Sequence, residues 1–392
     1  MLGVKTAALP ASLRRTNQRT IISLLMRLGC ASRAELAKAA GMSQPTAGKI
    51  TTDLLRLGIL QEVDGTNGRV PRLGRPGQML RLADRDPRFV VLELGVNETR
   101  MAMLPVAVQL EDRWTQRIPT LASGAALAKE LKRAASASVQ GQFWGVLISV
   151  PGIVDENAGR VLFSPNLHWL ESADLDKLAR QVWDAPVLLV QEIRALALGQ
   201  LTADPGGEDF LLVDFGQGVG GAIVLEGKLY PHPMPLSGEL GHTPVAGNQR
   251  RCGCGATGCL ETLVSERGLL ESFGCGDWEA LVGHVSANGI PAWLSETLAA
   301  TAKVIAGALN VLGIHRVIVT GLLTELPGCV DALSAEIKAG SMWARFGQVE
   351  CQGAPRRRSA GLVAAGLDRL VLPAAEDRRL LTSEGAKERR KF

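Results

Sequence analysis

The first sixty residues alternate apolar and polar positions at the spacing of amphipathic helices. Three such segments are separated by glycines, and the pattern predicts helices over residues 16–28, 32–40 and 43–57. Ser32 followed by Glu35 has the spacing of a capping box, and Ser43 is placed to cap the third helix. Two helices joined by a tight glycine turn, the second beginning with small polar residues, are typical of a helix-turn-helix.

Two extended stretches, residues 59–63 and 78–82, follow these helices and bracket a glycine-rich loop that carries arginines. The pattern predicts a two-stranded wing, because arginines on a slim loop suit phosphates or the narrow minor groove of A·T-rich DNA. A small helical dimerisation module is the alternative, but the agreement of cap, turn, helix and basic loop favours DNA binding. The residues expected to contact double-stranded DNA are Gln44, Thr46, Lys49, Thr52, Arg72 and Arg75.

From residue 88 onward, apolar runs typical of buried strands alternate with helical segments. The runs begin at Phe89, Trp144, Ala185, Asp209 and His315. Strands that alternate with helices predict an α/β body. The fourth run ends in a glycine-rich turn, residues 216–221, which suits either a loop that approaches an anion or a tight hairpin.

Charge divides the chain in the same way as the hydrophobic pattern does. Residues 1–90 hold fifteen lysines and arginines against six acidic residues, whereas the remainder holds twenty-eight against thirty-three. A basic head on a mildly acidic body favours a nucleic-acid-binding module attached to a second unit. With 392 residues, 46% of them apolar, the chain has material for two or three domains, and a largely disordered protein is excluded. No apolar run approaches the roughly 18 residues of a membrane span and no signal peptide is evident, so we expect a cytoplasmic protein.

Three of the seven cysteines crowd into eight residues, and a histidine stands ten residues before the first of them. Three thiolates and one imidazole satisfy tetrahedral Zn²⁺ completely and leave no position for a substrate, so we expect a structural zinc site. Isolated buried thiols are the alternative. The predicted ligands are His242, Cys252, Cys254 and Cys259.

Four segments of the body resemble the ROK family, which joins bacterial sugar kinases with sugar-responsive repressors. They are SVPGIVDENAGRVLFSPNLHWL, FGQGVGG, GELGHTPV and CGCGATGCLE, in the family's order, within a match over roughly residues 16–372. The basic head resembles that of the repressor branch, since the family's kinases lack it. The resemblance implies a body of two ribonuclease H-like, actin-like ATPase lobes with a sugar cleft between them.

The same resemblance assigns zinc to the four predicted ligands and implies a set of sugar-contacting residues. Carboxylate, amide and imidazole groups suit sugar hydroxyls, which need both donors and acceptors. Surface glutamates without a ligand are the alternative for Glu239 and Glu261. The implied sugar contacts are Asn166, Glu192, Glu239, His242 and Glu261.

The nucleotide side departs from the family in four places. The phosphate loop is Glu93–Asn97 instead of Asp-x-Gly-Gly-Thr, and Gln217 replaces the threonine of the second glycine turn. Leu322 replaces a glycine on the adenine side. The catalytic Asn-Asp pair is Gln191-Glu192, whose extra methylene moves the carboxylate away from the position of the base. We therefore expect that kinase activity is lost.

The expected organisation is a winged helix-turn-helix at residues 1–83, lobes at 88–200 and 201–372, and a C-terminal helix or tail at 373–392. The expected function is a transcriptional regulator, most simply a repressor of carbohydrate metabolism that binds its operator as a homodimer or homotetramer under control of a sugar-type effector. Two alternatives remain open. One is an active sugar kinase with a DNA-binding head, and the other is a ligand-independent DNA-binding protein whose body only assembles it.

Overall fold

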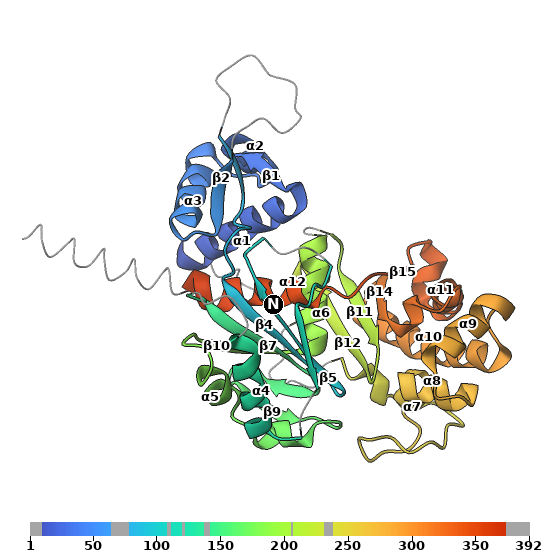
Figure 1. The fold of residues 1–392 in the computed structure, drawn as a ribbon. Coiled ribbons are helices and arrows are strands. Elements are labelled where there is room, and N and C mark those ends of the chain that lie inside the picture. The colour runs from blue at the N-terminus through green and yellow to red at the C-terminus, as the bar shows by residue number, and fades with distance from the viewer. Residues whose placement is uncertain are drawn as a thin grey trace, which may run out of the picture.

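The structure is a computed structural model, and it describes residues 10–63, 78–107, 111–119, 122–136, 142–204, 207–230 and 238–373. A small N-terminal head lies against a larger body that contains two sheets (Figure 1). None of the helices in these ranges has the length and hydropathy that a membrane span requires.

The head is built, within the described residues, from three helices and a small sheet. The predicted caps are present, because Ser32 and Glu35 form the capping box of the second helix and the Ser43 hydroxyl accepts the Thr46 amide of the third. The elements are α1 (Pro10–Leu28), β1 (Cys30–Ser32), α2 (Arg33–Ala39), α3 (Gln44–Arg56), β2 (Leu60–Val63) and β3 (Met79–Leu82).

Two features of the head differ from the sequence-based expectation. Helix α1 begins at Pro10, so Thr16, the first residue of the expected helix, lies inside it. The additional turns carry Arg14 and Arg15, which form ion pairs with residues far along the chain, and such tertiary contacts are invisible in local sequence. The three-residue strand β1, which pairs with β3, is too short to show a pattern.

Strands β2 and β3 form the predicted antiparallel pair, with Leu60 opposite Leu82 and Val63 opposite Met79. The loop that joins them is residues 64–77, and it lies outside the described residues. The predicted DNA contacts Arg72 and Arg75 lie in this loop, so the structure does not place them.

The first body sheet has the strand order β10-β7-β4-β5-β6. Strand β4 pairs with β5 antiparallel and with β7 parallel, and β7 pairs with β10 parallel. A β8–β9 hairpin and three helices accompany it. The elements are β4 (Phe89–Leu94), β5 (Glu98–Leu104), β6 (Gln116–Pro119), α4 (Gly124–Ser136), β7 (Gly145–Val150), β8 (Ile153–Asp155), β9 (Arg160–Phe163), α5 (Leu175–Arg180), β10 (Val187–Gln191) and α6 (Glu192–Ala203).

The second body sheet repeats this arrangement with the order β13-β12-β11-β14-β15. Strand β11 pairs with β12 antiparallel and with β14 parallel, and β14 pairs with β15 parallel. The elements are β11 (Phe210–Phe215), β12 (Val219–Leu225), β13 (Lys228–Leu229), α7 (Glu261–Val264), α8 (Glu266–Phe273), α9 (Trp278–Asn288), α10 (Ala292–Leu312), β14 (Arg316–Gly321), α11 (Cys329–Gly340) and β15 (Glu350–Gly353).

The chain then returns to the first sheet through α12 (Arg358–Gly366) and the π-helical η5 (Leu367–Val371). Helix α12 packs along α6, so closely that a β-carbon on Gly361 would lie 1.8 Å from the Ala195 carbonyl oxygen. In Figure 1, α12 is the red helix between the head and the first sheet. Residues 358–371, expected to be part of the second lobe, therefore pack with the first, because the chain crosses back after β15.

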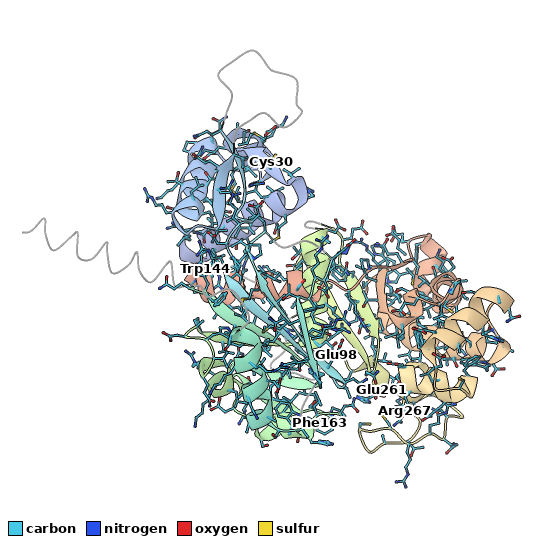
Figure 2. All side chains as sticks on the ribbon, in the orientation of Figure 1. Cys30, Glu98, Trp144, Phe163, Glu261 and Arg267 are labelled. Carbon is cyan, nitrogen blue, oxygen red and sulfur yellow. The ribbon has the colours of Figure 1, made fainter. Side chains whose placement is uncertain are left out.

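The head and the first sheet share one continuous hydrophobic core. At their junction the Trp144 ring meets Phe89 edge-on, with 5.9 Å between ring centroids, and the Arg88 guanidinium lies 5.1 Å from the Trp144 ring centroid. A β-carbon on Gly58 of the head would lie 3.7 Å from Trp144, which Figure 2 labels at this junction. The polar segment 84–88 therefore joins two parts that are packed together.

Candidate functional site

A cavity with a volume of about 540 Å³ lies between the two body sheets. Residues from the ends of β4, β10, β11 and β12 line it, together with the loops that follow them. Such an opening between two α/β units at the strand ends is where small ligands bind. All five residues implied as sugar contacts, Asn166, Glu192, Glu239, His242 and Glu261, line this cavity.

The four predicted metal ligands come together at one edge of the cavity. Their ligand atoms all lie within 4.8 Å of one another. The Cys254 and Cys259 sulfurs are 3.7 Å apart, and the Cys252 sulfur is 3.6 Å from the His242 Nδ1 atom. A tetrahedron with Zn–S bonds of about 2.3 Å has edges of about 3.8 Å, so the spacing and the donor set both fit zinc. A bound zinc would cross-link the loop between Glu239 and Glu261.

Two carboxylates connect this cluster to the cavity. Glu239 lies 3.8 Å from the second ring nitrogen of His242, and burial raises the pKa of Glu239 despite the nearby histidine. Glu261 accepts the Val219 backbone amide at 3.0 Å, and one of its oxygens lies 3.7 Å from the Cys252 sulfur. Carboxylates that touch metal ligands fix the orientation of those ligands and are themselves positioned by them.

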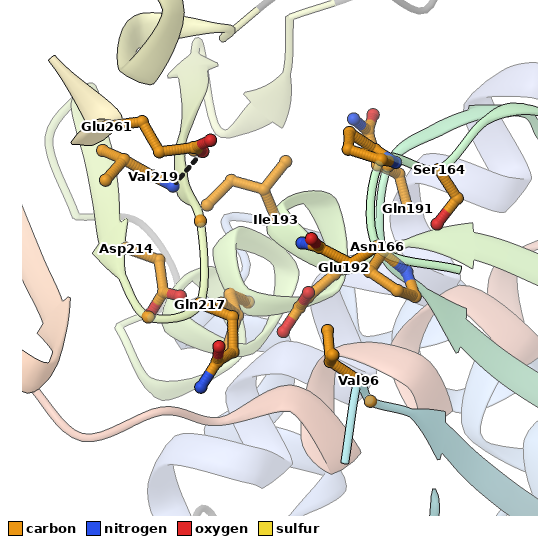
Figure 3. A pocket seen from close by; sticks show the side chains of 18 of the residues that line it. Val96, Ser164, Asn166, Gln191, Glu192, Ile193, Asp214, Gln217, Val219 and Glu261 are labelled. Atoms are coloured by element: carbon orange, nitrogen blue, oxygen red, sulfur yellow. Dashed lines mark hydrogen bonds between the residues drawn. The ribbon is translucent and has the colours of Figure 1, made fainter. Parts of the chain in front are cut away.

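The opposite wall of the cavity comes from the first sheet (Figure 3). Asn166, Gln191 and Glu192 lie on this side, and the Gln191 side-chain oxygen is buried without a hydrogen-bond partner. The Ser164 hydroxyl, also in this wall, is likewise buried and unpartnered. Buried polar atoms that lack partners are rare, so these two point to a ligand that would supply them.

Arg358, the first residue of α12, lies between Glu192, at the position of the family's catalytic pair, and Glu93, at the position of its phosphate loop. It is 2% exposed and forms ion pairs with Glu93 at the end of β4 and with Glu192 at the start of α6. Burial would lower the pKa of Arg358, but Glu192 and Glu93 outweigh it and raise the pKa above its ordinary value. Glu192 is therefore held by a cation that belongs to the protein.

A second arginine, Arg356, lies between β15 and α12, and its side chain contacts the end of β11. The Arg356 guanidinium binds both carboxylate oxygens of Asp214, at 2.8 and 2.9 Å, and the Phe215 carbonyl at 2.9 Å. Burial would raise the pKa of Asp214, but the paired Arg356 outweighs it and lowers the pKa below its ordinary value. The Thr320 hydroxyl donates a further hydrogen bond to Asp214 at 2.7 Å.

The glycine-rich turn at residues 216–221 is part of a hairpin between β11 and β12, which confirms the second of the two readings of this pattern. Its Gln217 side chain hydrogen-bonds Glu266. Gln217 and Leu322 both line the cavity, as do Gly95 and Asn97 of the phosphate-loop position. The four departures from the kinase pattern are therefore neighbours in space.

In the head, three of the four DNA-contact candidates that the structure places are exposed. Gln44, Thr46 and Lys49 lie on the free face of α3, and Thr52 is half-buried with its hydroxyl bonded to the Gly48 carbonyl at 2.8 Å. Asp53 of the same helix is buried and paired with Arg14 of α1.

The sequence-based prediction did not include the two arginines of the cleft, Arg356 and Arg358. Their signal was available as three consecutive arginines, residues 356–358, directly before an apolar helix. A charge run usually marks a solvated surface, and only the return of α12 to the first sheet buries this one. The reading also missed Asp112, which caps α12 by accepting the backbone and hydroxyl groups of Ser359, each at 2.7 Å.

Comparison with known proteins identifies the body. The model of the ROK family matches residues 89–365. The chain belongs to the ROK family. This ROK protein is 28% identical over 272 residues to a putative xylose repressor of Caldicellulosiruptor sp., and the match covers 66% of each chain, slightly less than two thirds of the relative.

Kinases are also among the relatives of this ROK protein. A glucokinase of Halalkalibacterium halodurans is 30% identical over 195 residues, covering 47% of this chain and 58% of the relative. Among solved structures, a ROK family transcriptional regulator, homolog of the E. coli MLC protein, has a TM-score of 0.66 at 18% identity and covers 93% of this chain and 98% of the other. At that identity the likeness concerns the fold, which is the actin-like ATPase fold of the family.

Proposed function

We propose that this ROK protein is a DNA-binding transcriptional regulator, most simply a repressor, whose body binds a sugar-type effector and does not phosphorylate it. The observation that carries the proposal is the head, which the family's kinases lack. Its helix α3 is capped by Ser43 and presents Gln44, Thr46 and Lys49 on an exposed face. With α2 before it and the β2–β3 pair after it, α3 has the order of elements of a winged helix-turn-helix.

Three further properties belong to this proposal. The operator is double-stranded and A·T-rich, because Arg72 and Arg75 of the loop after β2 suit a narrow minor groove. The protein acts as a homodimer or homotetramer, since two-fold assemblies match the half-sites of an operator. The names of two relatives, both xylose repressors, support a role in carbohydrate metabolism.

The cleft arginines support the absence of kinase activity. Phosphoryl transfer needs a free base, a phosphate cradle and bound nucleotide together. Here Glu192, which replaces the base, is paired with Arg358, and Asp214, at the end of β11 before the second glycine turn, is paired with Arg356. A nucleotide phosphate that entered this half of the cleft would have to displace ion pairs that are already made.

The sugar half of the cleft supports an effector. Glu239 and Glu261 line one wall of the cavity, and Asn166 lines the other, together with Ser164 and Gln191, whose buried side-chain oxygens lack hydrogen-bond partners. The fit of the Cys/His cluster to zinc gives this half a structural role for the metal, which would hold the loop that carries Glu239 and Glu261.

DNA selection from genomic fragments with the purified full-length chain tests the proposal and supplies the operator. Lys49→Ala should then weaken operator binding about five- to tenfold and make its salt dependence shallower, because one phosphate contact is lost. Lys129→Ala, an exposed lysine of α4 in the body, is the matched control. If no sequence is enriched, the proposal of a DNA-binding regulator is contradicted. If the two variants bind the operator equally, α3 is not part of the DNA interface.

A thermal-shift screen with unphosphorylated pentoses and hexoses, beginning with xylose, tests the effector. A stabilising sugar should lose its effect in Glu239→Gln and should change operator affinity in a gel-shift titration. If no sugar stabilises the protein while operator binding is intact, the body serves only to assemble the DNA-binding protein.

A further inference from the structure

A line of ion pairs runs from the wall of the cleft to the head, and Glu156 stands in the middle of it. Glu156 lies in the turn between β8 and β9, with a side chain 14% exposed. One of its oxygens accepts the Gln191 backbone amide at 3.0 Å and the Arg194 Nε at 3.1 Å. Glu156 therefore holds the junction of β10 and α6, at which Gln191 and Glu192 enter the cavity.

The other oxygen of Glu156 faces away from the cleft. It accepts an Arg369 nitrogen at 2.8 Å, and a second Arg369 nitrogen binds the Glu156 carbonyl at 3.0 Å. Arg369 belongs to η5, the short π-helix that continues α12. One acidic side chain thus joins the cavity wall to the last helix of the described chain.

The neighbouring residue of η5 continues the line into the head. Asp368 forms ion pairs with Arg15 and Arg19 of α1, the former at 3.2 Å. On the same helix, Arg14 forms an ion pair with Asp53, which is buried in α3. The helix proposed to contact DNA is therefore bound, through α1 and η5, to the residue that positions Gln191.

Helices α12 and η5 are fixed at both ends, which suits them to transmit displacement. Arg358 anchors the start of α12 inside the cleft, on Glu93 and Glu192. The close approach of Gly361 to α6 leaves no room for α12 to slide without moving α6. Closely packed elements with two arrangements convert small shifts at one site into movement at another.

We propose that Glu156 is a positioning residue that couples occupancy of the cleft to the orientation of α1 and α3. This inference rests on the proposed function, because it assumes that the cleft binds an effector and that α3 binds DNA. A ligand that hydrogen-bonds Gln191 or draws Glu192 from Arg358 shifts the start of α6. Glu156 passes this shift to Arg369, and Asp368 passes it to α1.

Amide hydrogen exchange of the full-length chain, with neither DNA nor sugar present, tests the coupling alone. Glu156→Gln keeps the side-chain shape and removes the charge, and it should speed exchange in α1 and α3 about tenfold while leaving α10 of the second sheet unchanged. Glu156→Asp should have a smaller effect, because the attraction to Arg369 remains. Asp176→Asn, which breaks the half-exposed pair with Arg180 on α5, is the matched control and should change neither helix.

Coupling is reciprocal, so the converse variant gives a second, independent measurement. Asp368→Asn, made at the head, should speed exchange in β10 and α6 at the cleft. Effects of Glu156→Gln confined to residues 153–163 and 187–203, with α1 and α3 unchanged, would overturn the proposal. If Glu156→Gln does not fold, wild-type exchange of β10 and α6 in Asp368→Asn overturns it instead. Neither result depends on whether the chain binds DNA, which the operator experiment decides separately.

Discussion

The sugar half and the nucleotide half of the cleft both carry carboxylates, but they differ in whether arginines of the chain pair with these carboxylates. On the sugar side, Glu239 and Glu261 face the cavity and touch the Cys/His cluster. On the nucleotide side, Glu93 and Asp214 are each bound by an arginine from residues 356–358, and so is Glu192, which the family resemblance also implies as a sugar contact.

Under the proposed function, this difference separates a sensor cleft from a kinase cleft. A kinase must leave its nucleotide side free for phosphates and metal ions, whereas a sensor gains from filling it. Filling it with arginines of the chain neutralises the acidic groups on this side. Among the described residues, no arginine pairs with Glu239 or Glu261 on the sugar side, so these carboxylates can recognise a ligand.

The largest expected effect comes from breaking the ion pairs of Arg358 with Glu93 and Glu192. Arg358→Met would leave Glu93, itself 7% exposed, without its main cation. Removing one partner of a buried ion pair costs about 3 to 5 kcal/mol, so the free energy of unfolding in urea should fall by that amount. Arg180→Met, which breaks an exposed pair, should change it by under about 1 kcal/mol. Equal stability of the two variants would show that the ion pairs of Arg358 contribute little to the free energy of unfolding.

The sugar side should depend on zinc instead. Protein purified without chelator should contain about one zinc ion per chain, and Cys254→Ser should weaken zinc binding at least about 100-fold, since only three ligands remain. Competition with a coloured chelator measures the affinity, and Cys275→Ser, an exposed cysteine outside the cluster, is the control. Absence of zinc by elemental analysis would contradict the site.

The pairing of Asp214 with Arg356 should appear in the pH dependence of stability. The pKa of Asp214 is lowered in the folded protein, so its stabilising contribution is present above the unfolded pKa of about 4 and is lost as pH falls through the folded value. Asp214→Asn should therefore be less stable than the parent at pH 7, by about 1 to 3 kcal/mol, and the gap should narrow in acid. Urea midpoints measured from pH 7 to pH 3 decide it, and a constant gap would count against the pair.

The smallest expected effect is on catalysis. Restoring the family's residues with Gln217→Thr and Leu322→Gly should yield no ATP-dependent sugar phosphorylation, because Arg358 still holds Glu192. A coupled assay over a sugar panel should stay at background for the parent and the double variant alike. Reproducible turnover in the parent that vanishes in Glu192→Gln would make this protein a kinase with a DNA-binding head.

Local sequence was sufficient for several features of the molecule. The caps at Ser32 and Ser43, the β2–β3 pair and the strands that begin near Phe89, Trp144 and Asp209 follow from patterns of a few residues. The proximity of the cysteines in the Cys/His cluster was also predictable, since three cysteines within eight residues cannot lie far apart. These predictions succeeded because the interactions involved join neighbours along the chain.

Only the tertiary structure determined which side chains of the cleft are paired with each other. The ion pairs of Arg358 with Glu93 and Glu192 join residues 265 and 166 positions apart, and the contacts of Arg15 with Asp368 span 353. No periodicity encodes such pairs, because their energy depends on where α12 packs after the chain has crossed both sheets. The sequence by itself determined which groups this ROK protein carries, and the return of α12 to the first sheet determined which of them remain free, since burial forces opposite charges to pair.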